Sequence, residues 1–330
     1  MAVVTNTFTT ASPKGNRESL SDVVSMITPR DTPIYSSIGH STMDATFDEW
    51  EIDALNPPAA NAQLEGDTFT FAAVQPVTRV GNYAQILRKD WSISATQEGV
   101  KNAGNAEKRK KVQLKRGIEI RKDVELAILS NTASVGGATR ISGGLPTWLA
   151  TNADRGATGA NGGYNTGTKV TVAATNGTQR AFTQTLLDNM MQSAYKAGGN
   201  VTKAYVSPYA KGVFVQFMSN PNVATYRYMA ESGKNNTIVS NADIYASPWG
   251  EVEIVPNRVM ATNTSVARNV FLTDNELLSW QWLRPIQNVA NLAKIADSDQ
   301  GVIIAEGSLK VANEGGLAVI ADIFGTTAST

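Results

Sequence analysis

The sequence of 330 residues contains no cysteine and a single histidine, His40. Without thiols the chain forms no disulfide, iron–sulfur cluster or cysteine-based zinc site, and it has no thiol nucleophile. One imidazole is too few for a histidine-rich metal site and leaves at most one for catalysis. Because the usual inventory of enzyme side chains is nearly empty, we expect no cofactor.

The chain also lacks an excess of either charge, since 29 Lys and Arg balance 29 Asp and Glu. No net field therefore draws the whole molecule onto nucleic acid or a membrane. No stretch approaches the roughly 20 apolar residues that span a bilayer, and the polar start does not resemble a secretion signal. With 42% hydrophobic residues the chain can bury a core. These features predict a folded, soluble protein made in a cytoplasm, with no membrane partner.

Motifs for phosphate binding and catalysis are missing as well. Neither G-x-x-x-x-G-K-[ST] nor G-x-G-x-x-G occurs. His40 stands close in sequence to an aspartate and two serines, but sequence proximity does not form a triad and no G-x-S-x-G elbow accompanies it. The segment 297–301 resembles a calcium loop whose glycine comes one place early, which favours a β-turn. We expect no catalytic, cofactor-binding or metal residues.

The first 43 residues predict a polar arm with one short helix, over 17–27. This arm has too little apolar surface to form a core of its own, so it needs something else to lie on. Strand patterns follow at 44–50 and 80–93, joined by a turn-rich segment. A lone hairpin of this kind is marginal in water, which indicates that contacts come from outside it.

The clearest predicted element is a helix over 96–129, roughly 50 Å long at 1.5 Å per residue. Its apolar residues, among them Leu114, Ile120 and Ile128, fall on one arc. Gly99, Gly104 and Gly117 weaken this helix and predict a bend or a ragged first half. The opposite arc carries Lys108, Lys111, Lys115 and Arg116, which form a basic cluster in sequence with Arg109 and Lys110. This cluster could contact phosphate, but the neighbouring acidic residues and the zero net charge favour a solvated face.

The remainder of the sequence alternates between predicted helices and strands. A segment rich in Gly and Asn, 134–167, predicts long surface loops. Helices are predicted over 178–197 and 209–218, strands over 201–206 and 269–272, a hairpin over 242–255, and strands over 289–295, 301–311 and 316–324. The predicted fold class is therefore mixed α+β.

This order of arm, long hairpin, long helix, αβ region and β-rich return resembles the Hong Kong 97 fold of tailed-bacteriophage major capsid proteins. Short phrases add to the resemblance: NYAQI at 82–86, SISAT at 92–96, EIRKDVE at 119–125, LRP at 283–285 and LAKIADS at 292–298, the last with Ala296 where glycine is expected. The resemblance implies an N-terminal arm (1–43), an E-loop (44–95), a P-domain with a spine helix (96–177), an A-domain (178–285) and P-domain return strands (286–330).

The resemblance further implies a structural protein that assembles with itself, through hexamers and pentamers, into the icosahedral shell enclosing phage double-stranded DNA. Portal, scaffolding or decoration proteins would be its other partners, with non-specific contact to packaged DNA. Such a protein would be made in the host bacterial cytoplasm and would reside in the virion. Two alternatives stay open at this point: the shell of an encapsulin-like nanocompartment, and a hydrolase with a carboxylate pair.

Contacts between subunits are expected along the predicted E-loop. Its tip is stiffened by consecutive prolines, and its flanks hold more apolar surface than a two-stranded ribbon can hide. The residues expected to contact a neighbouring subunit are Asn56, Pro57, Pro58, Phe69, Phe71, Tyr83, Ile86 and Trp91. The basic residues of the predicted spine helix are candidates for contact with phosphate or with another subunit.

Overall fold

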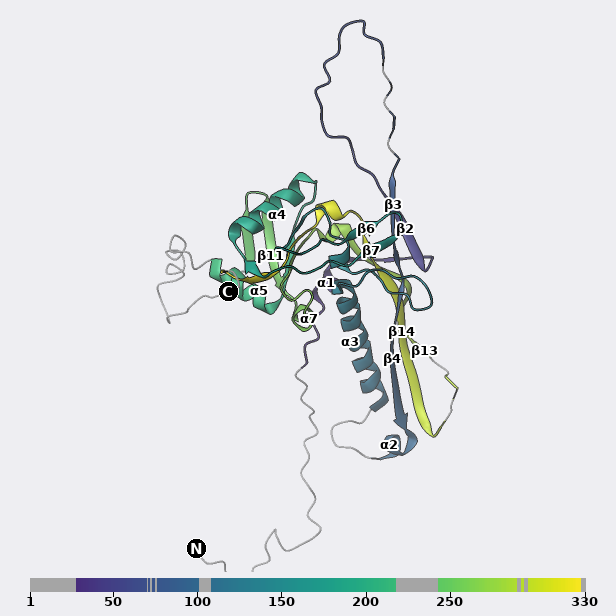
Figure 1. The fold of residues 1–330 in the computed structure, drawn as a ribbon. Coiled ribbons are helices and arrows are strands. Elements are labelled where there is room, and N and C mark those ends of the chain that lie inside the picture. Colours follow the sequence, from purple (N-terminus) through teal and green to yellow (C-terminus); the bar gives the residue numbers. More distant parts are fainter. Residues whose placement is uncertain are drawn as a thin grey trace, which may run out of the picture.

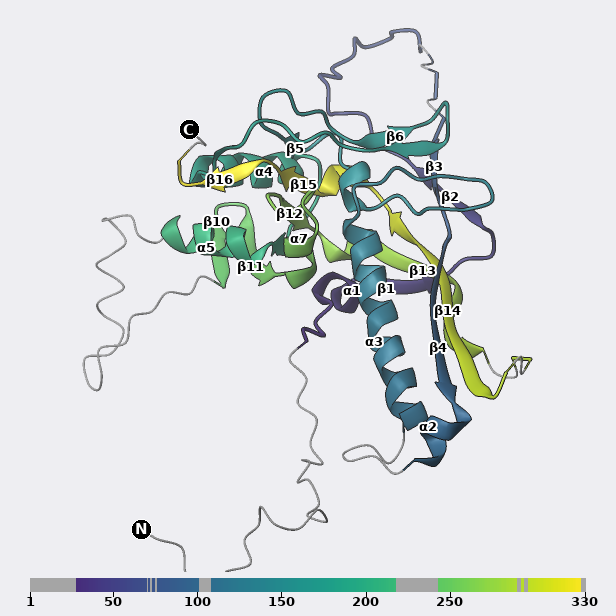
Figure 2. The same ribbon diagram turned by 60° about the horizontal axis from the view of Figure 1, so that its bottom comes forward.

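The computed structural model of the chain describes residues 28–69, 71, 73–74, 76–100, 108–217, 243–289, 292–293 and 296–327. Figures 1 and 2 show three parts: a lobe of helices and strands, an elongated part in which a long helix runs beside long strands, and a loop that projects away from both. Helices and sheets are mixed along the chain, so the predicted α+β class is confirmed. The predicted helix over 17–27 lies outside the described residues.

The elongated part contains a four-stranded sheet in the order β1-β13-β14-β4. β14 pairs antiparallel with both β13 and β4, and the short β1 lies parallel to β13. The helix α3 runs along this sheet (Figure 2). The bounds are β1 Gly39–Thr42, β4 Gln85–Ser94, β13 Leu278–Val289, β14 Ser298–Val311 and α3 Lys108–Leu129.

α3 is held by a stripe of apolar side chains spaced four residues apart. Ile120, Val124 and Ile128 have no exposed surface, as the repeat of a helix requires for side chains on one face. The predicted apolar arc does not continue into the first half of the helix, because Leu114 is 68% exposed. The second half of α3 therefore provides the packing, and the first half runs along the surface.

The helix predicted over 96–129, with a bend or a ragged first half, is interrupted at Val100. Ala95–Gly99 forms a separate short helix, α2, the residues 101–107 lie outside the described part of the chain, and α3 is described from Lys108. The Ser94 side chain caps α2 by accepting a hydrogen bond from the Gln97 N–H at 3.2 Å. Glycine has low helix propensity, which accounts for the end of α2 at Gly99. The described α3 has 22 residues and is about 33 Å long.

The lobe contains a six-stranded sheet in the order β10-β11-β9-β12-β15-β5. Its own core includes Phe182, Leu187, Met191 and Phe214, which are all buried. The predicted hairpin over 242–255 is confirmed as β10 and β11. The bounds are β5 Ala153–Asp154, β9 Lys203–Val206, β10 Ile244–Ser247, β11 Gly250–Pro256, β12 Val270–Thr273, β15 Ala318–Ile320, α4 Gln184–Lys196, α5 Pro208–Phe217 and α7 Arg258–Thr262.

Two predicted elements of the second half have wrong bounds. The helix predicted from 178 begins only after its cap, Thr183, because Arg180–Ala181 forms a short strand, β8, parallel to β16 (Ile323–Gly325). Of the strand predicted over 289–295, only Val289 is described as strand, as the last residue of β13; residues 292–293 lie in no strand, and the others lie outside the described residues. The strand pattern of β13 itself is interrupted at Pro285, since proline is disfavoured inside sheets, and the pairing register shifts between Arg284 and Gln287 around it.

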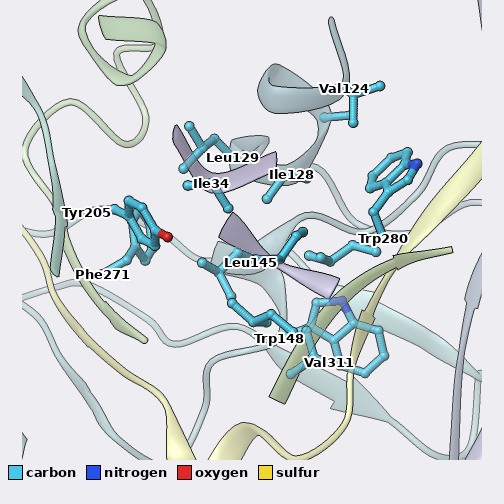
Figure 3. Close-up of a cluster of buried hydrophobic side chains, with 14 of the residues drawn as sticks. Ile34, Val124, Ile128, Leu129, Leu145, Trp148, Tyr205, Phe271, Trp280 and Val311 are labelled. Atoms are coloured by element: carbon cyan, nitrogen blue, oxygen red, sulfur yellow. The ribbon is translucent and has the colours of Figure 1, made fainter. Parts of the chain in front are cut away.

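The segment 134–167 is not only a set of surface loops. Its apolar side chains Leu145, Trp148 and Leu149 are almost fully buried and pack in one cluster with α3 and the long sheet. Figure 3 shows Leu145 and Trp148 in this cluster, close to Ile128 and Val311. A short 3-10 turn, η1 (Leu145–Thr147), and the small hairpin β6 (Gly163–Asn165) and β7 (Val170–Val172) shape the segment. The prediction of exposed loops failed because these apolar residues are few and irregularly spaced.

A buried carboxylate on α3 connects the end of the arm to the lobe. Glu125 has no exposed surface and accepts hydrogen bonds from the N–H groups of Ile34 at 3.0 Å and Tyr35 at 2.8 Å. Both belong to a short helix, α1 (Pro33–Ser37), which the sequence had predicted as polar coil. Glu125 also accepts from Nδ2 of Asn257, the N-cap of α7, at 2.5 Å. The Glu125 side chain on α3 thereby satisfies three donors from two other parts of the chain, α1 and the N-cap of α7.

Burial raises the pKa of Glu125 above its ordinary value of 4.5, although its three hydrogen-bond donors oppose the rise. A carboxyl whose pKa is raised on folding favours the folded state most below the unfolded value, and this contribution is lost as pH rises through the folded value. We therefore expect the wild-type chain to lose stability relative to Glu125→Gln, whose amide does not titrate, as pH rises above the ordinary value of 4.5.

Across this pH range, the free energy of unfolding of wild type should fall relative to that of Glu125→Gln by about 1.4 kcal/mol for each unit by which folding raises the pKa of Glu125. Urea midpoints of both chains at each pH measure it, and the comparison cancels the titration of all other groups. Parallel pH profiles of the two chains would contradict a raised pKa at this position.

Candidate assembly surface

The projecting loop is carried by a two-stranded ribbon. β2 (Phe47–Ile52) and β3 (Thr78–Tyr83) pair antiparallel, with Phe47 opposite Tyr83 and Ile52 opposite Thr78. The prediction of two strands joined by an exposed segment is confirmed, and Figure 1 shows the loop extending away from the body. The strand predicted over 80–93 is divided at Ala84, where the chain leaves the ribbon and enters β4.

The loop exposes its apolar side chains almost completely. Leu55 is 98% exposed, Leu64 80%, Phe69 91%, Phe71 95% and Val74 93%. Burying a large apolar side chain stabilises a protein by roughly 1.5–3 kcal/mol. Covering these five side chains with another molecule would therefore be strongly favourable. The tip residues Asn56, Pro57 and Pro58 are exposed too, as predicted. A loop of this composition is typical of a surface that another molecule covers.

The root of the loop is fixed by a buried amide. Asn82 has no exposed surface, and its Nδ2 donates to the carbonyl of Leu309 at 2.7 Å and to that of Gly143 at 3.1 Å. Its Oδ1 accepts from the Gly143 N–H at 2.9 Å. Because these partners come from β14 and from the 134–167 segment, Asn82 ties the ribbon to the body and holds the loop in one direction.

A second set of polar contacts supports the same root. Glu306 is 3% exposed and accepts hydrogen bonds from Arg284 at 2.9 Å and from Arg140. Arg140 also donates from Nε to the carbonyl of Ala84, the residue at which the ribbon ends, at 3.1 Å. A buried carboxylate paired with two guanidinium groups is costly to break, so the junction between ribbon and sheet is rigid.

Three flanking residues predicted to meet another subunit differ in their surroundings. Trp91 is 8% exposed and packs against Gly301, so the expectation that another chain must cover it is wrong. Tyr83 is half-buried and its ring lies 4.5 Å from that of Phe47. Ile86 is 48% exposed. The sequence could not separate these cases, because β14 covers β4 from a position more than 200 residues away.

Several basic side chains of the α3 cluster have hydrogen-bond or ion-pair partners within the same subunit. Lys108 is buried and its Nζ donates to the carbonyls of Gln97 and Val100, so its candidacy for phosphate contact is wrong. Arg109 pairs with Asp299, and Arg116 pairs with Glu119 at 2.7 Å. The other members of the cluster are Lys110 and Lys115, which are exposed, and Lys111, which is half-buried.

A groove of about 570 Å³ opens beside the root of the loop. Ile52, the last residue of β2, and Val80 of β3 line one part of it, together with Val311 of β14. Its aromatic wall consists of Trp148 and Tyr164, whose rings are stacked at 5.5 Å with an angle of 4° between them. The sequence did not predict this feature: Trp148 and Tyr164 stand out as large aromatic residues in a segment otherwise rich in glycine, but nothing in their spacing indicates that the two rings stack.

The residues considered for catalysis do not assemble into a site. The ring of His40 lies 4.7 Å from that of Tyr35, while Ser37 donates from Oγ to the carbonyls of Pro33 and Ile34. Asp299 of the suspected calcium turn pairs with Arg109. Within the described ranges, no group of three or more His, Cys, Asp or Glu is placed to hold a metal ion. Within the same ranges, no helix is long and apolar enough to cross a membrane.

Comparison with known proteins gives a consistent result. The family model described as SU10 major capsid protein matches residues 3–324. A curated relative, the major capsid protein of Escherichia phage Phieco32, is 31% identical over 127 residues. That match covers 38% of this chain and 36% of the relative, so the chain aligns with about a third of the relative's length.

Solved structures extend the likeness to nearly the whole chain. The capsid structure of cyanophage P-SCSP1u superimposes with a TM-score of 0.58 at 13% identity, covering 97% of this chain and 96% of that one. The SrpI encapsulin of Synechococcus elongatus PCC 7942 gives a TM-score of 0.56 at 12% identity, with 96% and 95% covered. At these identities the likeness shows the fold, which is the Hong Kong 97-like fold implied by the resemblance.

Proposed function

Because the chain belongs to the SU10 major capsid protein family, we propose that it assembles with itself, through hexamers and pentamers, into the icosahedral shell that encloses phage double-stranded DNA. Its place would be the virion, after synthesis and assembly in the cytoplasm of a bacterial host. We assign it no enzymatic activity, since in the described part of the chain the ring of His40 lies against that of Tyr35 and Asp299 of the 297–301 turn pairs with Arg109.

The observation that carries this proposal is the projecting loop, whose apolar side chains are 80–98% exposed at Leu55, Leu64, Phe69, Phe71 and Val74. A monomer gains nothing from such a loop, and a shell of identical subunits supplies a covering surface for each copy. The rigid root at Asn82 supports this role, because an oriented loop loses less conformational freedom when it docks.

The remaining basic residues of α3 fit weaker, electrostatic contacts. Lys115 is exposed and Lys111 is half-buried, on a helix segment from 108 to 116 that contains no acidic residue. Such groups would bind DNA phosphates without sequence preference or pair with acidic residues of a neighbouring subunit. Portal, scaffolding or decoration proteins are further partners expected of a capsid subunit.

A direct test is to express the chain alone and examine it by sedimentation and electron microscopy. We expect closed, roughly icosahedral particles, or particles once a scaffolding protein from the same genome is added. A compact monomer under all salt, concentration and scaffold conditions would contradict the proposal. Particles that package an enzyme and exclude DNA would favour the encapsulin-like alternative, which shares the fold.

A further inference from the structure

We propose that the groove beside the loop root receives Phe69 and Phe71 from the projecting loop of a second copy of this chain. The inference rests on the proposed function and names the surface with which the loop engages its neighbour. Each copy would present its own loop to one neighbour and its own groove to another.

The groove has the composition of a receptor for aromatic side chains. Its volume of about 570 Å³ is lined on the accessible side by Ile52, Val172 and the half-buried ring of Tyr164, while Trp148 and Val80 are only 3% and 5% exposed and support this lining from behind. Val172 of β7 lies at its edge and is 46% exposed, so one apolar wall remains open to solvent. Aromatic rings gain beyond simple burial when they pack on other rings, by about 0.5–1.5 kcal/mol.

Phe69 and Phe71 are suited to fill such a groove. They are two residues apart in a segment without helix or strand, and both exceed 90% exposure. In extended backbone, residues two apart point to the same side, so the two rings can enter one surface together. The groove is lined by Ile52 and Val80 of the ribbon that carries the loop, and Figures 1 and 2 show the loop extending from that ribbon away from the body of its own chain.

The first half of α3 is the other surface that a neighbouring loop could meet, but it offers less apolar area. Leu114 is exposed there, between Lys111 and Lys115. Covering phenylalanine rings with this face would desolvate the neighbouring ammonium groups, which costs free energy unless each finds an anion. The groove also has a charged residue in its lining, Glu314, but this carboxylate already accepts hydrogen bonds from the N–H groups of Ala150 at 3.0 Å and Thr151 at 3.1 Å, so covering it costs less.

Loop-into-groove contact is heterologous, because the two surfaces differ. Contacts of this type close into rings when the rotation between neighbours divides a full turn. The same contact therefore serves rings of five and of six subunits with a small change in angle. It also explains why the root is rigid, since Asn82 and Glu306 set the direction in which each loop reaches its neighbour.

The absence of cysteine from the chain allows a direct test by disulfide crosslinking. A disulfide forms only when the two Cα atoms lie about 4.4–6.8 Å apart, so it reports close approach. The double variant Phe71→Cys with Val172→Cys is expected, on oxidation, to convert most of the monomer band on non-reducing gels into a ladder of covalent oligomers. Phe71→Cys with Tyr195→Cys, at an exposed site on α4, is the matched control and should stay largely monomeric.

Three results would overturn the inference: no ladder from the Phe71/Val172 pair, an internal disulfide within single chains, or a ladder formed instead by Phe71→Cys with Leu114→Cys on α3. The crosslinking is also read on concentrated, unassembled chain, where the contact predicts disulfide-linked dimers. Failure of wild-type chain to form shells would therefore count against the proposed function, while the Phe71/Val172 dimer would still support the groove.

Discussion

Replacing residues 54–76 by a short Gly-Ser turn is expected to leave a folded subunit that no longer forms shells. The replaced segment contains the five almost fully exposed apolar side chains and none of the buried core. The ribbon that carries it stays intact, because Ile52 and Thr78 still pair and Asn82 keeps its partners. The variant thus removes the expected contact with a neighbour without disturbing the packing of the chain itself.

Thermal unfolding measures whether this variant is folded, and electron microscopy of the same variant shows whether it forms shells. We expect an unfolding midpoint close to that of the unassembled wild-type subunit, and no closed particles at concentrations at which wild type assembles. A milder companion is Phe69→Ser with Phe71→Ser, which keeps the loop length and should weaken assembly. Normal shells from the shortened loop would show that it is not a clamp between subunits, and an unfolded chain would show that it belongs to the subunit's own core.

Local sequence signals predicted those parts of the fold whose structure depends on near neighbours. The exposed tip at Asn56, Pro57 and Pro58 followed from turn chemistry. The end of α4 at Lys196, shortly before Gly198 with its positive φ of 91°, agrees with the preference of that conformation for glycine after a helix. The second half of α3 followed from its apolar spacing, and the overall order of elements was enough to identify the fold.

Long-range contacts decided the features that the sequence did not predict. Trp91 resembled an exposed ribbon residue, but β14 covers it from the far end of the chain. Glu125 resembled one acid of a solvated helix face, yet its partners lie 90 to 132 residues away. The groove wall of Trp148 and Tyr164 could not be predicted, because stacking of those two rings depends on how an irregular segment folds back on β14 and the ribbon.

The central role of α3 gives the second large expected effect: Ile120→Pro should yield no soluble, folded subunit. Proline removes the backbone N–H that bonds one turn back, and its ring clashes with that turn, at a cost of about 3 kcal/mol or more. Ile120 is also fully buried in the cluster that includes Trp280 and Leu309, so the damage is not confined to the helix. A typical domain has only about 5–15 kcal/mol of stability, and the loss extends through Glu125 to α1 and α7.

Ile120→Ala is the matched control, because it removes buried methyl groups while keeping the helix hydrogen bond. Its cost of roughly 2–5 kcal/mol should lower the unfolding midpoint and still permit some folded protein. Soluble yield and circular dichroism of the two variants, made side by side, separate backbone damage from lost packing. If Ile120→Pro gave soluble, assembled particles, α3 could not be the element on which the packing of the arm, the long sheet and the lobe depends. Those parts would then fold without an intact α3.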